Sequence, residues 1–419
     1  MEIPKLRRSN VTFVSKNKES INFANNELYQ KILKQINSLK FENSEYLSFS
    51  DIAENFHISG VEKIIKLVNY FYNKEYNSLV IFTNTQVELE FLAIKNFVLS
   101  AFDPYEEYKI KCIFINSSDV GSLLIEKLKY LQSLKDNKSA FIFTDYFGNS
   151  NQINNYFQIT RSFLSKNIDE KILKNNLFYI GKFKLSLNDF YTQLNEKNIF
   201  FTADDIHDKF VAFSDLTLFL IATQGINIKK FVRGYCKILK RFIGNNWQTN
   251  DAFKFASFVH FGQFKTITFI SNFKETEIFS KLFAYEFNTI NLGLNCWFDY
   301  LNFTDDCAFI AQCIINGNIN NTKALINFEI SYPNYDFQFT SDINNIDNLS
   351  DFDLLTLNDI QKTSQKTLFN YSESMNPDIF WMNLQIENTK EESCAMVIAF
   401  LYWSKIFLSL INNQSPFKN

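Results

Sequence analysis

Short apolar runs and helix-like segments alternate along the chain from about residue 60 onwards. The apolar runs predict strands, and the segments between them have the spacing of helices. The predicted strands are Leu79–Thr83, Lys111–Ile115, Ala140–Thr144, Leu177–Ile180 and Ile199–Thr202, and the predicted helices are Val87–Ala101, Val120–Ser133 and Ile153–Ser165. Both faces of these strands are apolar, and the connections between them contain helices. We therefore expect a parallel sheet that is covered by helices on both sides.

The pattern repeats after a helical region at Asp215–Ile243. A second set of strands is expected at Lys265–Ile270, Lys323–Glu329 and Phe380–Ile386, with helices at Glu275–Phe287, Asp306–Ile315 and Leu357–Phe369. Residues 341–353 form a polar stretch that indicates a loop. The chain is therefore predicted to be an α/β protein with two tandem domains, each a three-layer α-β-α sandwich around a parallel sheet.

The two ends of the chain are predicted to be helical. Leu28, Ile32, Leu33, Ile36 and Leu39 have the spacing of an amphipathic arm. Cys394–Ile411 has the length of a short membrane span, but Ser404 and Lys405 near its middle favour a buried helix with one polar edge. The predicted boundaries are residues 1–55 for the N-terminal helical arm, 56–205 and 206–390 for the two domains, and 391–419 for the C-terminal helix and tail.

Composition narrows the classes of function. Hydrophobic residues make up 46% and charged residues 21% of the chain, and the net charge of −3 argues against nucleic acid and against an anionic membrane surface as partners. The six cysteines have no metal-ligand spacing and the first residues have no apolar leader, so we expect buried reduced thiols, no metal, no cofactor and a cytoplasmic protein. Only ten residues are glycine, although backbone amides that bind phosphate closely need glycine.

The most specific stretch is Phe200–Arg233, FFTADDIHDKFVAFSDLTLFLIATQGINIKKFVR. It resembles the signature segment of bacterial glucose-6-phosphate isomerases, in which a strand runs into D-D-V-G-G-R-F-S and then into an apolar helix that ends in G-(V/I)-(N/D). Residues 302–329, 365–386 and 394–417 are similar to later family segments in the same order. The resemblance covers roughly residues 60–417 and implies two sugar-isomerase (SIS) domains and a homodimer.

The residues that this resemblance would make catalytic are replaced. The glycine-rich loop reads Phe82–Gln86 without glycine, where we expect a capped helix start, and the phosphate loop is Phe147–Gln152, which keeps one hydroxyl, Ser150. Lys209 stands for the arginine of the family, beside Asp208 and His207, which we interpret as a surface histidine.

The proton-transfer groups are lost as well. The stretch Phe287–Asn295, matched to the catalytic glutamate segment, contains no acid, and the one acid within reach, Glu286, belongs to the preceding helix. Ala308 replaces the ring-opening histidine. Losing one such group costs about 10²–10⁴-fold in rate, so the sequence predicts no catalytic residue and a vestigial ligand-binding set of Ser150, Lys209 and Gln365.

Three functions follow from this reading. The first is a catalytically inactive, isomerase-like structural or interaction subunit of a cytoplasmic protein assembly, with a cytoskeletal or motility-linked assembly as a guess within it. The second is a regulatory module that senses a sugar phosphate through Ser150, Lys209 and Gln365. The third is a working glucose-6-phosphate/fructose-6-phosphate isomerase with replaced site residues.

Overall fold

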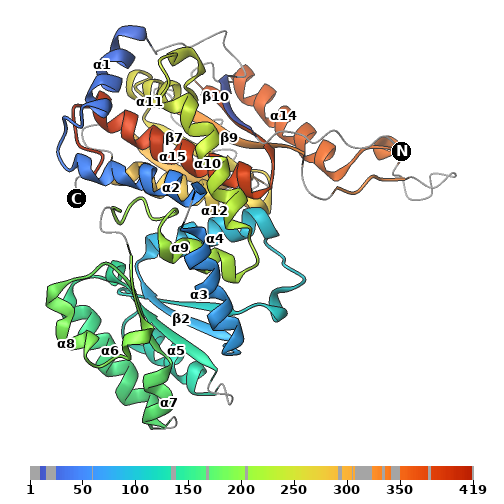
Figure 1. The fold of residues 1–419 in the computed structure, drawn as a ribbon. Coiled ribbons are helices and arrows are strands. Elements are labelled where there is room, and N and C mark those ends of the chain that lie inside the picture. The colour runs from blue at the N-terminus through green and yellow to red at the C-terminus, as the bar shows by residue number, and fades with distance from the viewer. Residues whose placement is uncertain are drawn as a thin grey trace. The chain divides into compact units, whose positions relative to one another are not determined.

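The computed structural model describes residues 10–15, 25–58, 60–133, 138–166, 169–202, 206–290, 295–303, 305–306, 323–332, 336–340, 350–375 and 379–417. The chain divides into two compact units, each built around its own sheet (Figure 1). One unit holds residues 43–95 and 99–233, here called the first unit. The other holds residues 1–42, 96–98 and 234–419, here called the second unit.

The sheet of the first unit has the strand order β3-β2-β4-β5-β6, with every neighbouring pair parallel. The strands are β2 (Ser78–Thr83), β3 (Lys111–Asn116), β4 (Ser139–Phe143), β5 (Leu177–Gly181) and β6 (Ile199–Phe201). The five strands predicted here are thus confirmed, each to within one or two residues at its ends. Their apolar residues on both faces explain the arrangement, because a strand buried on both sides needs helices above and below it.

Helices cover both faces of this sheet. One face carries Phe82 and Phe143, which stack at 4.2 Å between ring centroids, and packs against α5 (Ser122–Ser133) and α6 (Ser150–Leu164). On the other face Phe178 contacts Phe71 of α3 (Val61–Asn73), which also contacts Phe219 of α9 (Asp215–Thr223). The remaining helices of this unit are α2 (Ser48–Ile58), α4 (Thr85–Leu99), α7 (Glu170–Asn175), α8 (Asn188–Tyr191) and the first part of α10 (Ile228–Phe242).

The sheet of the second unit is mixed, which corrects the prediction of a purely parallel sheet. Its order is β1-β10-β9-β7-β8, and β1 (Val11–Ser15) is antiparallel to β10 (Ile379–Asn388). The parallel strands beside them are β9 (Lys323–Tyr332), β7 (Thr266–Ser271) and β8 (Trp297–Asn302). The sequence pattern missed β1 and β8. Both lie at the edges of the sheet, where a strand has one neighbour and a weaker apolar signal.

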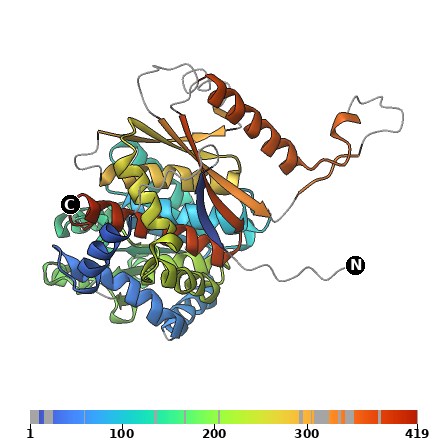
Figure 2. The same cartoon turned by 90° about the horizontal axis from the view of Figure 1, so that it is seen from above.

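The second sheet is also covered on both faces, as Figure 2 shows for α14 (Leu357–Met375) and α15 (Glu391–Ile411). Trp381 of β10 packs against Phe369 of α14 on one side. On the other side Phe269 of β7 contacts Phe255 of α11 (Asp251–Phe261) and Phe283 of α12 (Lys274–Thr289). The many phenylalanines of the sequence therefore fill the space between each sheet and its helices.

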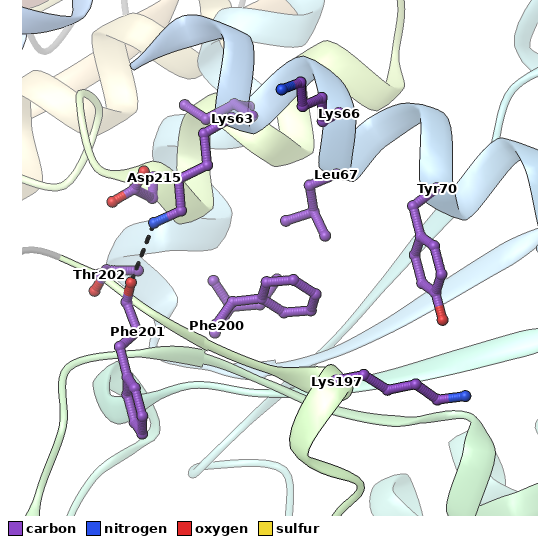
Figure 3. A pocket seen from close by; sticks show the side chains of 11 residues that line it. Lys63, Lys66, Leu67, Tyr70, Lys197, Phe200, Phe201, Thr202 and Asp215 are labelled. Atoms are coloured by element: carbon purple, nitrogen blue, oxygen red, sulfur yellow. Dashed lines mark hydrogen bonds between the residues drawn. The ribbon is translucent and has the colours of Figure 1, made fainter. Parts of the chain in front are cut away.

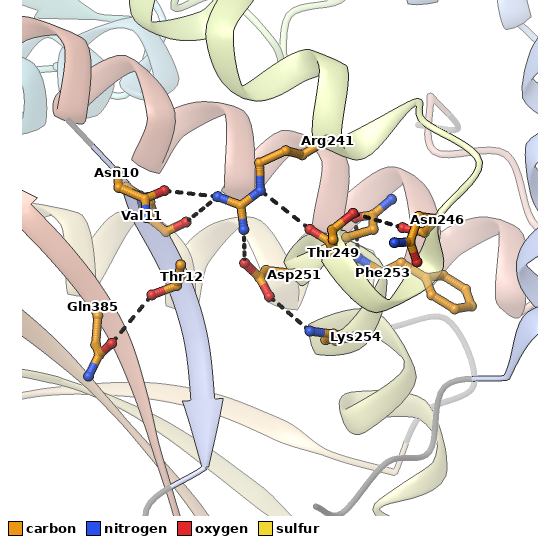
Figure 4. Close-up of polar contacts among 11 residues, drawn as sticks. Asn10, Val11, Thr12, Arg241, Asn246, Thr249, Asp251, Phe253, Lys254 and Gln385 are labelled. Carbon is orange, nitrogen blue, oxygen red and sulfur yellow. Dashed lines mark hydrogen bonds and ion pairs between the residues drawn. The ribbon is translucent and has the colours of Figure 1, made fainter. Parts of the chain in front are cut away.

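Arg241 of α10 ties the N-terminal strand to this unit (Figure 4). Its guanidinium donates to Asn10 Oδ1 at 2.9 Å and to the Val11 carbonyl at 3.3 Å, and it forms an ion pair with buried Asp251. Lys254 Nζ lies 3.3 Å from Oδ1, the other oxygen of the Asp251 carboxylate. Burial raises the pKa of Asp251, and the two cations offset part of that rise. These contacts use the planar, multidentate geometry that a lysine at 241 would lack.

The structure divides the chain at different residues from those predicted. The N-terminal segment is not one helical arm, because β1 and α1 (Asn26–Asn37) group with the second unit and residues 43–55 with the first. The boundary predicted at residue 205 falls instead at residue 233. The reason is that α9 packs on α3 through an almost wholly apolar surface, which joins residues 206–233 to the first unit.

The C-terminal helix α15 is long and apolar enough to cross a membrane, but it is buried inside the protein along its length. This confirms the predicted buried helix. Ser404, Lys405 and Ser409 are buried too, so the helix has no exposed polar edge. The predicted helix at Asp306–Ile315 and most of the polar stretch 341–353 lie outside the described residues.

Candidate functional site

Polar residues of the first unit gather where the strands of its parallel sheet end. Asp145 follows β4, Lys182 follows β5, and His207 follows β6 after residues outside the described range. In doubly wound sheets, ligands bind at the carboxyl edge of the strands. The candidate site is therefore this edge, and it contains two of the three predicted residues, Ser150 and Lys209.

The loop after β2 is a capped helix start, as predicted. Asn84 is the N-cap of α4, and its side-chain oxygen accepts a hydrogen bond from the Val87 amide at 3.0 Å. Thr83 is fully buried at the end of the strand, so its hydroxyl is removed from solvent. This side-chain cap occupies a helix N-terminus that could otherwise accept an anion.

The phosphate loop matched to Phe147–Gln152 is closed by its own side chains. Asn149 and Gln152 form a capping box at the start of α6: Asn149 Oδ1 accepts from the Gln152 amide at 2.9 Å, and Gln152 Oε1 accepts from the Asn149 amide at 3.1 Å. Gly148 has a φ of +138°, and the side chain of Gln152 lies where a Cβ of residue 148 would be. The surface of the remaining glycine is therefore covered by protein.

Ser150, the hydroxyl retained in this loop, is bonded to another hydroxyl. Its Oγ lies 2.5 Å from Ser186 Oγ, and both side chains are at least partly exposed. Phe147, the first residue of this loop, is buried and contacts Phe82 and Tyr156. An aromatic ring therefore fills the part of the loop that lies against the core.

A buried carboxylate, Asp145, precedes this loop in the chain. Asp145 is only 7% exposed, and its Oδ1 has no hydrogen-bond partner among the residues the structure describes. Burial raises the pKa of the Asp145 carboxyl, and the charges of Lys184 and Lys182 offset part of the rise. Burial likewise raises the pKa of the neighbouring Tyr146 phenol well above its usual value. An ionised Asp145 would repel a phosphate bound at the start of α6.

The turn after β6 holds His207, Asp208 and Lys209. His207 is buried at 5% exposure and contacts the ring of Tyr46, so its interpretation as a surface histidine is wrong. Its Nδ1 lies 3.2 Å from the Lys209 amide and 2.8 Å from Asp208 Oδ1. Burial acts to raise the pKa of Asp208, but the contact with His207 and the lysine charges lower it overall. Lys209 itself is half-buried.

The other predicted residues belong to the second unit. Gln365 is buried on α14, and its Nε2 has no hydrogen-bond partner within the described part of the chain. Glu286 of α12 is fully buried and forms an ion pair with Lys405 of α15. It is therefore held in the core and is not presented at a sheet edge. Ala308 lies outside the described residues.

The sequence interpretation overlooked three members of the site: Asp145, Lys182 and Lys184. Each follows a predicted strand directly or within a few residues, so the rule that ligands bind at carboxyl ends of strands could have identified them. The two ammonium groups are engaged by backbone, since Lys182 Nζ donates to the Ile206 carbonyl at 2.7 Å and Lys184 Nζ to the Asp145 carbonyl at 3.3 Å. Among the residues described, no cluster of histidine, cysteine and carboxylate side chains could hold a metal ion.

Replacing Asp145 by Asn is expected to change how stability depends on pH. Because the folded-state pKa of Asp145 is raised, the folded wild type binds more protons than the unfolded chain between the two pKa values, and its stability falls as pH rises through that window. The variant lacks this loss and should be more stable than wild type at pH 8, by about 1–3 kcal/mol. Urea unfolding at pH 4.5, 6 and 8 measures the difference. A variant whose free energy of unfolding decreases relative to wild type as the pH rises would contradict the expectation.

The curated proteins most similar to this chain in sequence include two glucose-6-phosphate isomerases. No protein-family profile matches the sequence. Glucose-6-phosphate isomerase of Mesomycoplasma hyopneumoniae is 23% identical over 393 residues, which cover 88% of this chain and 85% of that protein. The same enzyme of Mycoplasmopsis pulmonis is 23% identical over 229 residues, which cover 54% of this chain and about half (52%) of that relative.

Solved structures share the fold. A hypothetical protein of Thermus thermophilus superposes with a TM-score of 0.77 at 14% identity, covering 94% of this chain and 91% of that one. A glucose-6-phosphate isomerase from Chlamydia trachomatis gives a TM-score of 0.70 at 12% identity, covering 94% and 82%. The chain thus has the α/β fold of these solved structures. In sequence it is similar, at 23% identity, to glucose-6-phosphate isomerases.

Proposed function

We propose that this chain is a catalytically inactive isomerase-fold protein that serves as an interaction subunit of a cytoplasmic protein assembly. The observation that carries the proposal is the closed phosphate loop. The capping box of Asn149 and Gln152 occupies two backbone amides and covers Gly148, and a buried carboxylate, Asp145, precedes the loop in the chain. A sugar phosphate would have to displace the capping side chains and approach a carboxylate.

The burial and pairing of Glu286 and His207 support the proposed lack of isomerase activity. An aldose–ketose isomerase moves a proton between neighbouring carbons and needs a carboxylate in contact with substrate. Glu286, the acid nearest to the matched catalytic segment, is instead paired with Lys405 in the core. His207 is buried against Tyr46 and Asp208, which limits its use as a ring-opening acid.

An interaction role is supported by exposed apolar side chains on two hydrogen-bonded segments of the second unit. Residues 336–340 and 350–357 are joined by hydrogen bonds from the Phe339 amide to the Leu355 carbonyl and from the Leu357 amide to the Phe337 carbonyl. Phe337 is 60% and Leu354 67% exposed. Clustered apolar surface of this kind is typical of protein contact sites.

The test of inactivity is a coupled assay of the purified chain with glucose 6-phosphate and fructose 6-phosphate. We expect no turnover above that of a mock purification, and the same result for Lys209→Ala. An active glucose-6-phosphate isomerase in the same assay serves as positive control. Turnover that Lys209→Ala abolishes would show that the site still works and would contradict the proposal.

The alternative is a regulatory module that senses a sugar phosphate. It is favoured by the paired hydroxyls of Ser150 and Ser186 at the start of α6, with Lys182 and Lys184 on the neighbouring segment. Calorimetric titration with fructose 6-phosphate separates the two functions. Saturable micromolar binding that Ser150→Ala weakens supports the sensor, whereas the interaction subunit predicts no binding.

A further inference from the structure

A cavity lies in the first unit, on the face of the sheet opposite to α5 and α6. Its volume is about 470 Å³, within the range of small-molecule sites. Figure 3 shows Leu67 of α3 and Phe200 of β6 facing each other across it. Lys63, Thr202 and Asp215 lie at one end, and Tyr70 and Lys197 at the other.

The cavity exists because α3 covers the sheet incompletely. The helix packs Phe71 on Phe178 of β5, with the two ring centroids 4.8 Å apart. Phe200 of β6 is the register partner of Ile180, one strand further toward the edge, and it is only half-buried. β6 is the short last strand of the sheet, and Leu67 of α3 is half-buried where it faces Phe200 across the cavity.

The charge around this apolar floor has one predominant sign. Lys63, Lys66 and Lys197 line the cavity, against the single carboxylate of Asp215. Glu62, the acid closest to this part of α3 in sequence, lies 2.7 Å from Lys229 in an ion pair. Lys74 adds a further ammonium group, 5.8 Å from the centroid of the Tyr70 ring. The end formed by Tyr70 and Lys197 is therefore cationic, with a phenol as an additional hydrogen-bond donor.

We propose that this cavity binds a small soluble anionic amphiphile. Its carboxylate or phosphate contacts Lys197 and Tyr70, and its aromatic or aliphatic body lies between Leu67 and Phe200. An apolar cleft with a few convergent polar groups is the usual form of a small-molecule site, and the lysines select the sign of the head group. The site is on the other face of the sheet from the phosphate loop, so it does not rest on the proposed function.

The experiment uses two fluorescent probes with similar aromatic bodies, the anion 1-anilinonaphthalene-8-sulfonate and the uncharged N-phenyl-1-naphthylamine. Lys197→Glu should lower the affinity for the anionic probe about tenfold, which is the size of one charge-assisted contact. The affinity for the neutral probe should change by less than about twofold. Leu67→Asp should weaken both probes at least tenfold. Lys171→Glu, an exposed lysine on α7, is the matched charge control and should change neither.

Circular dichroism and thermal melting of each variant show that the fold is kept. Decanoate should displace the anionic probe from wild type, whereas phosphatidylglycerol vesicles should not carry the protein in a flotation assay. Anionic-probe binding that is equal in wild type and Leu67→Asp would place the probe elsewhere and overturn the proposal. If the protein binds the vesicles and decanoate does not displace the anionic probe, the site binds a lipid surface. That result would overturn the proposal of a soluble ligand.

Discussion

Replacing Glu286 by Gln is expected to lower the free energy of unfolding by about 3–5 kcal/mol, the largest single effect predicted for this chain. The carboxylate is 1% exposed and Lys405 is fully buried. Removing the negative charge leaves the buried Lys405 ammonium without its carboxylate counterion, which is costly in the core. Urea or thermal denaturation followed by circular dichroism measures the change.

The double variant Glu286→Leu with Lys405→Met is the informative control. Well-packed apolar residues of similar volume often replace a buried ion pair without loss, so the double variant should recover most of the stability. Lys229→Ala, which breaks the exposed pair with Glu62, should have no measurable effect. If Glu286→Gln also has no effect, the pair does not form in the core and Glu286 becomes available for chemistry.

The second large effect is expected for Gly234→Val, in the middle of α10. A Cβ at residue 234 would lie 2.6 Å from the Cα of Glu392 and closer still to its carbonyl oxygen. The backbone of α15 begins there, and a helix terminus in a packed unit cannot move away without disturbing its other contacts. Overpacking of this kind costs about 1–3 kcal/mol or more.

Gly234→Ala gives a graded comparison, since it introduces the Cβ alone. It should destabilise less than valine but still measurably, although alanine favours a helix over glycine by about 1 kcal/mol in open positions. Ser133→Ala, at the exposed C-terminal end of α5, serves as control. A stabilised Gly234→Ala variant would show that the two helices are further apart than the structure places them.

The extent of successful prediction differs between the fold and the site. Strands such as β2 and β4 are buried on both faces, so their sequences alone carried the pattern. The edge strands β1 and β8 were missed because edge strands are only partly buried: in β8, three of six residues are exposed. For the site, the motif pointed to Ser150 and Lys209, which the structure places after β4 and after β6; their binding role stays a prediction. The state of each side chain, such as the burial of His207, depends on contacts from distant segments that no local pattern records.

By itself the sequence determined the α/β class, the order of most strands and helices and the similarity to glucose-6-phosphate isomerases, and it predicts that the catalytic residue types of those enzymes are replaced. These follow from local periodicity and from residue identity at matched positions. Only the tertiary structure decided that Glu286 pairs with Lys405, 119 positions away, and that Gln152 folds back over Gly148. It also decided that Phe200 is left half-buried beside α3, because burial and pairing are properties of segments brought together by folding.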